Sequence, residues 1–139
     1  MISFRDQYRF MLEFCVRDYE CDLQGIVNNS VYLNYLEHTR HQFLKTQRID
    51  FAQLAEEDVH LVVIRIEIDY RVPLRSADCF VVGLNLERVT PLRLAFLQDI
   101  YRVPDLTQCI AARVVGTGIT RDGRLVGRER LKRLMDEVE

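Results

Sequence analysis

Residues 62–72 carry the most constraining pattern in this chain, with apolar side chains at every second position and charged side chains between them from Ile64 onward. The apolar positions are Val62, Ile64, Ile66, Ile68, Tyr70 and Val72, and the charged positions between them are Arg65, Glu67, Asp69 and Arg71. Because successive side chains of a strand point to opposite faces, this alternation predicts a half-buried β-strand. Pro73 follows the run and predicts its end, since proline cannot donate a hydrogen bond to a neighbouring strand.

Four further segments show the same period and predict strands at 10–17, 80–87, 92–103 and 109–120. The strand at 92–103 is apolar on both faces. Leu94, Phe96 and Ile100 lie on one face, and Leu97 and Tyr101 lie on the other. Ala95 and Val103 also lie on that second face. Such two-sided apolarity suggests that the second face also packs, for example on another subunit.

The period changes after residue 29, where apolar side chains return at helical spacing. Leu33, Leu36, Phe43 and Leu44 predict a helix over about 30–46. Asn28, Asn29 or Ser30 can cap its start by accepting backbone N–H bonds. A shorter helix is predicted over about 51–57. A terminal helix is predicted from the spacing of Leu131, Leu134, Met135 and Val138.

The order of these elements predicts an α+β fold. One strand precedes the long helix, and four strands with short connections follow, which favours an antiparallel meander. The long helix is the element available to cover the apolar face of the sheet, so we expect about five strands wrapped around a central helix. A length of 139 residues suits a single domain over 1–139.

The charge balance excludes some classes of partner. The chain has 19 basic and 21 acidic residues, so no basic excess points to nucleic acid. No stretch approaches the ~20 apolar residues of a membrane span. The four cysteines form no CxxC pair and the three histidines show no metal-ligand spacing beside them, so we expect no metal site. We therefore expect reduced, mostly buried thiols in a cytoplasmic protein.

The segment joining the first strand to the long helix is the richest in chemistry. Asp18, Glu20 and Asp22 place three carboxylates within five residues, and Gly25 permits close backbone approach. The free N–H groups of a helix N-terminus can polarise a carbonyl oxygen, and a nearby carboxylate can attack that carbonyl or activate water. From the residue types alone, a solvated acidic turn before a capped helix is the simpler interpretation.

Residues 16–40 resemble the signature region of the 4-hydroxybenzoyl-CoA thioesterase-like branch of the hotdog-fold superfamily. The matching positions are Tyr19-Glu20, Asp22, Gly25-Ile26-Val27, Asn28-Asn29, Tyr32-Leu33, Glu37 and Arg40. The resemblance implies the hotdog fold and an acyl-CoA thioesterase that hydrolyses its substrate to free acid and CoA. It also implies that no metal or redox cofactor is needed.

The resemblance assigns roles to particular residues. Asp22 takes the position of the catalytic aspartate, as nucleophile or general base, and the backbone N–H of Asn29 takes that of the carbonyl-polarising donor. The implied substrate-binding residues are Gly25, Val27, Asn28, Tyr32 and Glu37. This sequence departs from the family pattern at Ile26, where many relatives have a histidine.

Two groups of charged residues have competing interpretations. Glu37 could be the working carboxylate, as in related hotdog branches, but Arg40 at i+3 and His41 at i+4 favour an ordinary surface pair. Arginines at strand ends could meet the phosphates of CoA or simply solvate a strand edge. The candidates for CoA binding are Arg71, Arg75, Arg88 and Arg93.

Two alternative functions remain open on the same fold. An acyl-carrier-protein thioesterase would use the arginine-rich rim to meet an acidic protein partner. A non-catalytic acyl-CoA-binding protein would keep the pocket without the hydrolysis. The resemblance also implies a homodimer or homotetramer whose sheets join edge to edge, with the site at the subunit boundary.

Overall fold

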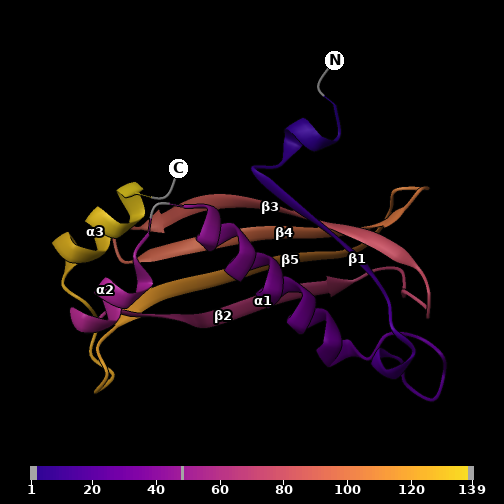
Figure 1. The fold of residues 1–139 in the computed structure, drawn as a ribbon, viewed down its shortest axis with the longest axis horizontal. Helices are drawn as coiled ribbons and strands as arrows, with labels where there is room; N and C mark the ends of the chain where they lie inside the picture. Colours follow the sequence, from indigo (N-terminus) through magenta and orange to yellow (C-terminus); the bar gives the residue numbers. More distant parts are fainter. Residues whose placement is uncertain (1–2, 48, 138–139) are drawn as a thin grey trace.

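The computed structural model describes residues 3–47 and 49–137, which form a five-stranded antiparallel sheet crossed on one face by a long helix (Figure 1). In chain order the elements are η1 (Arg5–Gln7), β1 (Phe10–Cys15), η2 (Asp18–Glu20), α1 (Asn29–Thr46), α2 (Phe51–Glu56), β2 (His60–Tyr70), β3 (Cys79–Thr90), β4 (Arg93–Val103), β5 (Thr107–Ile119) and α3 (Arg128–Glu137). The predicted α+β hotdog architecture is confirmed. The long helix begins one residue before its predicted start.

The predicted meander holds only for β3, β4 and β5. The strand order is β1-β3-β4-β5-β2, so β2 does not pair with β3 but crosses to the far edge and pairs with β5. The place beside β3 is taken by β1, which pairs with it from Phe10–Leu84 to Cys15–Cys79. Local periodicity identifies a strand but not its neighbour, and for this reason the sequence-based pairing of β2 was wrong.

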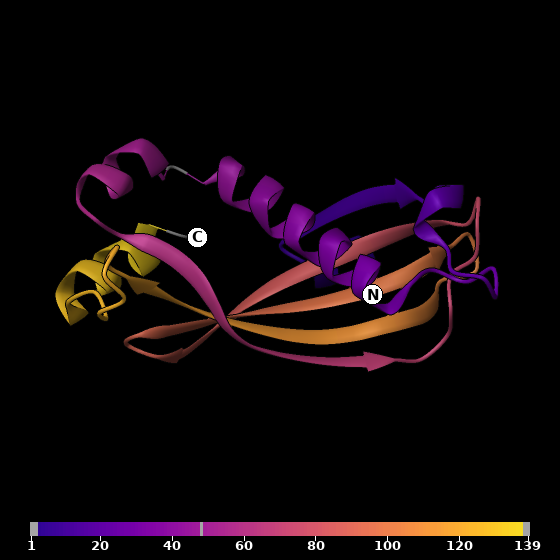
Figure 2. The ribbon, with the colours of Figure 1, turned by 90° about the horizontal axis from the view of Figure 1, so that it is seen from below.

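Helix α1 lies diagonally over the inner face of the sheet (Figure 2). Leu36 and Phe43 of α1 are almost completely buried, as are Phe80, Val82 and Ile100 of the sheet beneath. Of the three candidate caps, Asn28 acts as the N-cap: its side-chain oxygen accepts a 3.0 Å hydrogen bond from the N–H of Ser30. The buried side chains hold α1 against the sheet, and the Asn28 cap sets the residue at which the helix begins.

The outer face of the sheet is partly covered by the chain's own N-terminal segment. The Tyr8 hydroxyl donates to Asp99 Oδ2 at 2.8 Å, and the Phe4 ring packs edge-on against Tyr101 with centroids 4.8 Å apart. Gly83 lies directly under the Tyr8 ring, and a Cβ there would come within 2.6 Å of it. The second apolar face of the strand predicted at 92–103 is thus packed in part by the N-terminal segment of the same chain.

Two of the four cysteines are paired, which contradicts the expectation of reduced thiols for Cys15 and Cys79. These residues stand opposite each other in the β1–β3 register and form a disulfide, with Cα atoms 4.0 Å apart. They are separated by 64 residues in the sequence, so no local spacing revealed the pair. Cys21 and Cys109 are free thiols.

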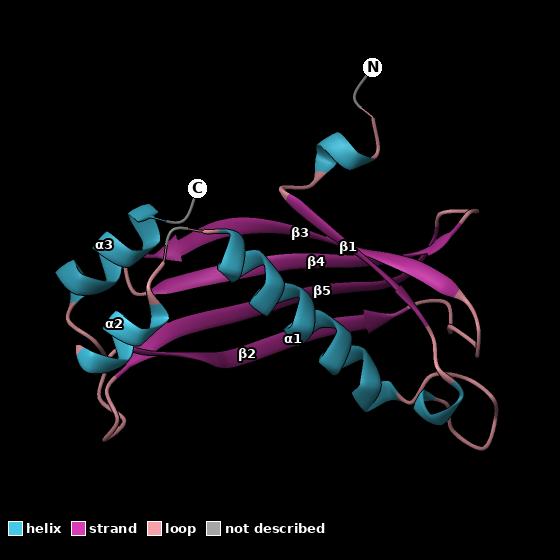
Figure 3. Ribbon diagram, in the orientation of Figure 1, coloured by secondary structure: helices cyan, strands magenta, loops and turns pink. Residues whose placement is uncertain are grey.

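A second, smaller cluster forms at the end of the sheet where α2 and α3 lie (Figure 3). Leu131 of α3 packs there with Val59 and Val126, so the predicted terminal helix is confirmed by its position and by Leu131. Val138 of that prediction lies outside the described residues. Within 3–47 and 49–137, no helix combines the length and apolarity needed to cross a membrane.

Candidate active site

The loop between β1 and α1 folds into a small hairpin. An antiparallel bridge joins Cys21 to Val27, and the N–H of Asp22 donates to Ile26 O at 2.8 Å. The turn closes through the N–H of Gly25, which donates to Asp22 O at 3.0 Å. Gly25 has φ +79°, a left-handed conformation that costs glycine little and other residues more. Asp22 is thereby placed at the tip of the hairpin.

The Asp22 carboxylate is exposed and is held by its own turn. Its Oδ1 accepts hydrogen bonds from the N–H of Gln24 at 2.8 Å and of Ile26 at 3.4 Å. Among the described residues none donates to Oδ2. A carboxylate with one oxygen held and the other accessible can accept a proton from water or attack an electrophile.

The N-terminus of α1 lies at the base of the same hairpin. The N–H of Asn28 donates to Glu20 O at 3.0 Å, and Asn29 is the first residue of the helix. No acceptor within the described part of the chain takes the N–H of Asn29. The first turn carries no acidic side chain, so the positive end of the helix dipole is uncompensated by charge. This end of α1 can bind a carbonyl oxygen or an anion.

Glu20 fixes the loop to α1. Its Oε1 accepts hydrogen bonds from the N–H of Arg17 at 2.8 Å and from the Tyr35 hydroxyl at 2.9 Å. Burial and the hydrogen bond to Glu20 raise the pKa of Tyr35 well above the usual value of a phenol. Glu20, the first carboxylate of the signature, therefore bonds to a side chain of α1, whereas Asp22 bonds only to backbone N–H groups of its own turn.

A third set of contacts fixes the loop to the segment that follows β2. The Ser76 hydroxyl donates to Asp18 Oδ1, and Ile26 forms an antiparallel bridge with Arg75. The N–H of Val27 donates to Leu74 O at 2.8 Å. The hairpin carrying Asp22 is thus fixed from two sides, by α1 and by residues 74–76.

The five residues predicted to bind substrate are not alike in position. Val27 and Tyr32 are buried in the core, and the Tyr32 hydroxyl accepts a 2.9 Å hydrogen bond from the N–H of Leu74. Burial raises the pKa of Tyr32. Asn28 is the helix cap and Gly25 a turn residue, while Glu37 is exposed two turns into α1.

Glu37 does not form the expected pair with Arg40. No salt bridge to Glu37 is present among the described residues, and Arg40 turns inward, where it is 7% exposed. Its Nη1 donates to Gln98 Oε1 at 3.0 Å, and Gln98 Nε2 donates to Leu36 O at 3.0 Å. Burial lowers the pKa of Arg40. A guanidinium bonded to a neutral amide in the core was not foreseen from the helical spacing.

The four predicted CoA-binding arginines lie at two different ends of the sheet. Arg71 and Arg75 follow β2, near the hairpin of Asp22, whereas Arg88 and Arg93 flank the β3–β4 turn beside α3. β3 separates these ends by roughly 30 Å or more, at about 3.3 Å per residue. Two are already engaged: Arg71 donates to Gln108 Oε1 at 2.9 Å, and Arg88 pairs with Asp136 at 2.8 Å.

Tyr70 is a site residue that the sequence pattern identifies only as part of a strand face. Its hydroxyl donates a 3.0 Å hydrogen bond to the carbonyl oxygen of Asn29, and its ring packs against Tyr32. Its position near the end of the alternating run, two residues before Val72, is the available signal. That position turns its side chain toward the start of the covering helix.

Residues 16–138 match the family model described as the thioesterase-like superfamily. The chain is similar to the chloroplastic acyl-acyl carrier protein thioesterase ATL2 of Arabidopsis thaliana, with 34% identity over 113 residues, covering 81% of this chain and 59% of that protein. It is also similar to the long-chain acyl-CoA thioesterase FadM of Escherichia coli, with 31% identity over 74 residues, covering 53% of this chain and 55% of that protein.

The fold has solved counterparts. The structure of YbaW from Escherichia coli superposes with a TM-score of 0.81 at 23% identity, covering 92% of this chain and 97% of that chain. The chain spans about three fifths of the length of the first curated relatives it matches. The match of the family model over most of the residues, together with these relatives, shows that this chain belongs to the thioesterase-like superfamily.

Proposed function

We propose that the protein is a thioesterase that hydrolyses an acyl thioester at the junction of the Asp22 hairpin and the N-terminus of α1. The observation that carries this proposal is the Asn29 N–H at the positive end of α1, which meets no acceptor among the described residues because the Asn28 cap takes the N–H of Ser30 instead. A donor of this kind stabilises the oxyanion that develops when a thioester carbonyl is attacked. The names of the relatives agree with this reaction.

Asp22 is the proposed catalytic carboxylate. As a general base it would take a proton from water, whose oxygen then attacks the carbonyl carbon while the C–S bond breaks and the thiolate leaves with a proton. As a nucleophile its oxygen would attack the carbonyl carbon and form an acyl-aspartyl anhydride as the C–S bond breaks and the thiolate leaves. Water would then cleave the anhydride to the free acid and the Asp22 carboxylate, and the proton released would go to the thiolate. In both routes the products are a carboxylic acid and a free thiol, and the Asn29 N–H carries the developing charge. Gly25 and Asn28 support both routes by shaping the turn and the cap.

The carrier of the acyl group is proposed to be coenzyme A, with an acyl carrier protein as the second candidate. The similarity to FadM supports the first and the similarity to ATL2 supports the second. Arg71 and Arg75 lie on the same side as the Asp22 hairpin and are the best placed arginines to meet a phosphate of the carrier. Arg88 and Arg93 lie too far along the sheet to share that phosphate within one chain.

The working unit is proposed to be a homodimer joined through β2, or a homotetramer made of two such dimers. β2 is an edge strand, and Ile64, Ile66 and Tyr70 expose between 39% and 49% of their surface there. Unpaired strand edges with apolar side chains favour pairing with another strand. Antiparallel pairing of two β2 strands would bring Arg88 and Arg93 of one subunit toward the Asp22 end of the other.

Release of free thiol from a panel of acyl-CoA and acyl-carrier-protein thioesters tests the function. We expect Asp22→Asn to lower kcat by about 10²- to 10⁴-fold while remaining folded, because it removes a general base or nucleophile. Asp6→Asn, an exposed carboxylate in η1, is the control and should keep full activity. Full activity in Asp22→Asn would overturn the assignment of Asp22. Binding of acyl-CoA without any hydrolysis would instead favour the non-catalytic alternative.

Light scattering tests the assembly, with an expected mass of at least twice 16.4 kDa. Ile66→Arg, which places a charge on the exposed edge, should yield monomers of low activity. A wild-type monomer with full activity would contradict the proposed dimer.

A further inference from the structure

A groove of about 880 Å³ lies between the second half of α1, helix α2 and the first half of β2. Its apolar lining includes Leu54 of α2, Val62 of β2, and Leu94 and Phe96 of β4. This volume is within the range of about 300–1,000 Å³ that is usual for small-molecule pockets. None of the residues placed at the reaction centre, Asp22 and Asn29, lines it.

The groove lies farther along α1 than the proposed reaction centre. α1 starts at the end of β2, where Tyr70 bonds Asn29, and then crosses the sheet diagonally toward β3 (Figure 1). Leu44 near the end of α1 and Val62 near the start of β2 both line the groove. At 1.5 Å per residue, Glu37 lies about 12 Å along α1 from Asn29 and Leu44 about 22 Å. The groove therefore begins roughly 12 Å from the proposed carbonyl position and ends near 22 Å.

We propose that this groove receives the hydrocarbon tail of the acyl group and selects long aliphatic chains, an inference that rests on the proposed thioesterase function. An extended chain advances roughly 1.3 Å per carbon, given C–C bonds of about 1.5 Å. The acyl chain thus enters the groove after about ten carbons and fills it at a length of about sixteen to eighteen carbons. A benzoyl or other short aromatic acyl group would end before the groove begins.

The wall contributed by α1 is more polar than the rest of the groove. Glu37, His41 and Lys45 line it and are exposed toward solvent. Long charged side chains can lay their methylene stems along apolar surface while the charged head stays in water. The apolar side chains of β2 and β4 form the floor of the groove and contact the acyl chain from below. The wall contributed by α1 forms the rim. Arg40 also lines the groove, but it is 7% exposed and its Nη1 already donates to Gln98. The occupant that fits such a lining is a flexible aliphatic chain.

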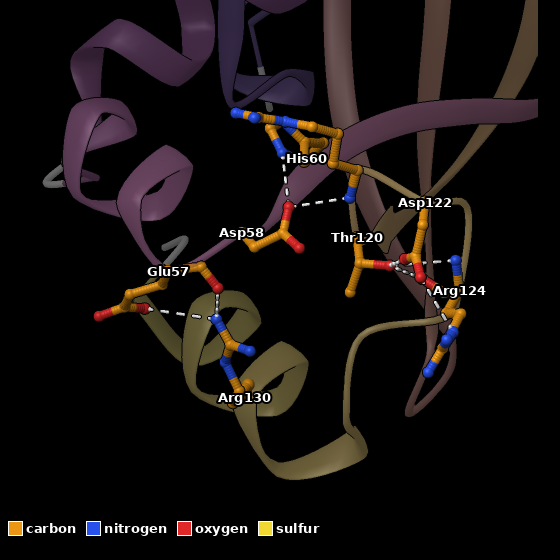
Figure 4. A network of polar contacts seen from close by, with 8 residues as sticks. Glu57, Asp58, His60, Thr120, Asp122, Arg124 and Arg130 are labelled. Atoms are coloured by element: carbon orange, nitrogen blue, oxygen red, sulfur yellow. Dashed lines mark hydrogen bonds and ion pairs between the residues drawn. The ribbon is translucent and has the colours of Figure 1, made fainter.

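The wall formed by α2 is held in place by polar contacts at its C-terminal end (Figure 4). Asp58, which follows α2, accepts hydrogen bonds on Oδ1 from the N–H of Arg121 at 2.8 Å and from His60 Nε2 at 3.0 Å. Arg130 of α3 donates to the carbonyl oxygen of Glu57. These contacts from the turn after β5, from β2 and from α3 fix the end of α2 over the groove, so a tail does not need to order this wall when it binds.

Bulk added inside the groove tests the proposal. Ala55 lines the groove from α2, whereas Ala52 lies on the same helix, is also exposed and does not line it. We expect Ala55→Trp to lower the ratio of kcat/KM for hexadecanoyl-CoA over octanoyl-CoA by at least about tenfold, since each methylene excluded from an apolar site costs about fourfold. Ala52→Trp should keep the wild-type ratio. An unchanged ratio in Ala55→Trp would overturn the proposal.

Binding of a fluorescent eighteen-carbon fatty acid provides a readout that is independent of hydrolysis. Wild-type protein and Ala52→Trp should bind the probe, and Ala55→Trp should bind it at least about tenfold more weakly. Equal binding by both variants would contradict the assignment of the groove. If no thioester of any length is cleaved but Ala55→Trp still loses the probe, the thioesterase function fails and the tail site stands. If Ala55→Trp changes the assembly state but neither chain-length ratio nor probe binding, the groove is an interface and the proposal is wrong.

Discussion

The hydroxyl of Tyr70 donates a 3.0 Å hydrogen bond to the carbonyl oxygen of Asn29 and so joins the end of the edge strand β2 to the first residue of α1. The same residue, Asn29, carries the N–H proposed to hold the thioester oxygen. The position of that N–H thus depends on a strand that is more than forty residues away in the sequence. This contact makes Tyr70 a positioning residue for the proposed reaction.

Tyr70→Phe should lower kcat about fivefold with little change in KM. The ring contact with Tyr32 is kept, and the lost hydrogen bond is worth about 1 kcal/mol. Steady-state kinetics and thermal unfolding of the variant measure the two effects separately. Tyr19→Phe, which alters an exposed hydroxyl bonded to Arg17, is the control. A Tyr70→Phe enzyme with wild-type kcat would contradict the positioning role.

Alkaline pH should destabilise the protein through Tyr35. Its folded-state pKa is raised, chiefly by burial, while the unfolded phenol ionises near its usual pKa of about 10. Below pH 10 both states hold the proton; above it the unfolded state releases the proton first, so the free energy of unfolding falls as pH rises. For one such group the slope reaches at most about 1.4 kcal/mol per pH unit.

Thermal unfolding between pH 8 and pH 11 measures this effect. Tyr35→Phe should show a shallower loss of stability above pH 10 than the wild type. Burial also raises the pKa of Tyr8, so part of the slope should persist in that variant and decrease further in the double variant with Tyr8→Phe. Identical slopes in all three proteins would show that these phenols are not the groups responsible.

Thiol titration should distinguish the Cys15–Cys79 disulfide from four free thiols. Denatured protein is expected to show the two thiols of Cys21 and Cys109 before reduction, and four after it. Cys15→Ser should expose a third thiol and lower the free energy of unfolding by about 2–4 kcal/mol, because the cross-link between distant residues restricts the unfolded chain. Four reactive thiols in unreduced protein purified under air would contradict the pairing.

Gly83→Ala should displace the N-terminal segment from the outer face of the sheet. The added methyl group would meet the Tyr8 ring, and overpacking of this kind costs about 1–3 kcal/mol. Limited proteolysis should cleave the variant more readily within the first ten residues. Gly127→Ala is a matched control, because a Cβ there meets nothing within 4 Å. Equal proteolysis of both variants would argue that Tyr8 does not depend on Gly83.

The strands and helices of this protein follow from short-range patterns. The alternation across 62–72 and the helical spacing of Leu36 and Phe43 place the main elements within a few residues of their observed ends. These patterns suffice because the side-chain period of a strand or a helix is a property of neighbouring residues. The role of the loop that carries Asp22 follows instead from the family resemblance of residues 16–40, because its residue types alone favour a solvated acidic turn.

Relationships between distant residues were decided only by the tertiary structure. The pairing of β2 with β5, the Cys15–Cys79 disulfide and the inward turn of Arg40 toward Gln98 each depend on which segments meet in the sheet. The same is true of Tyr70 and Asn29. A local period fixes which face a side chain takes but carries no information about the strand that lies beside it, so the register of the sheet had to be seen before these contacts could be known.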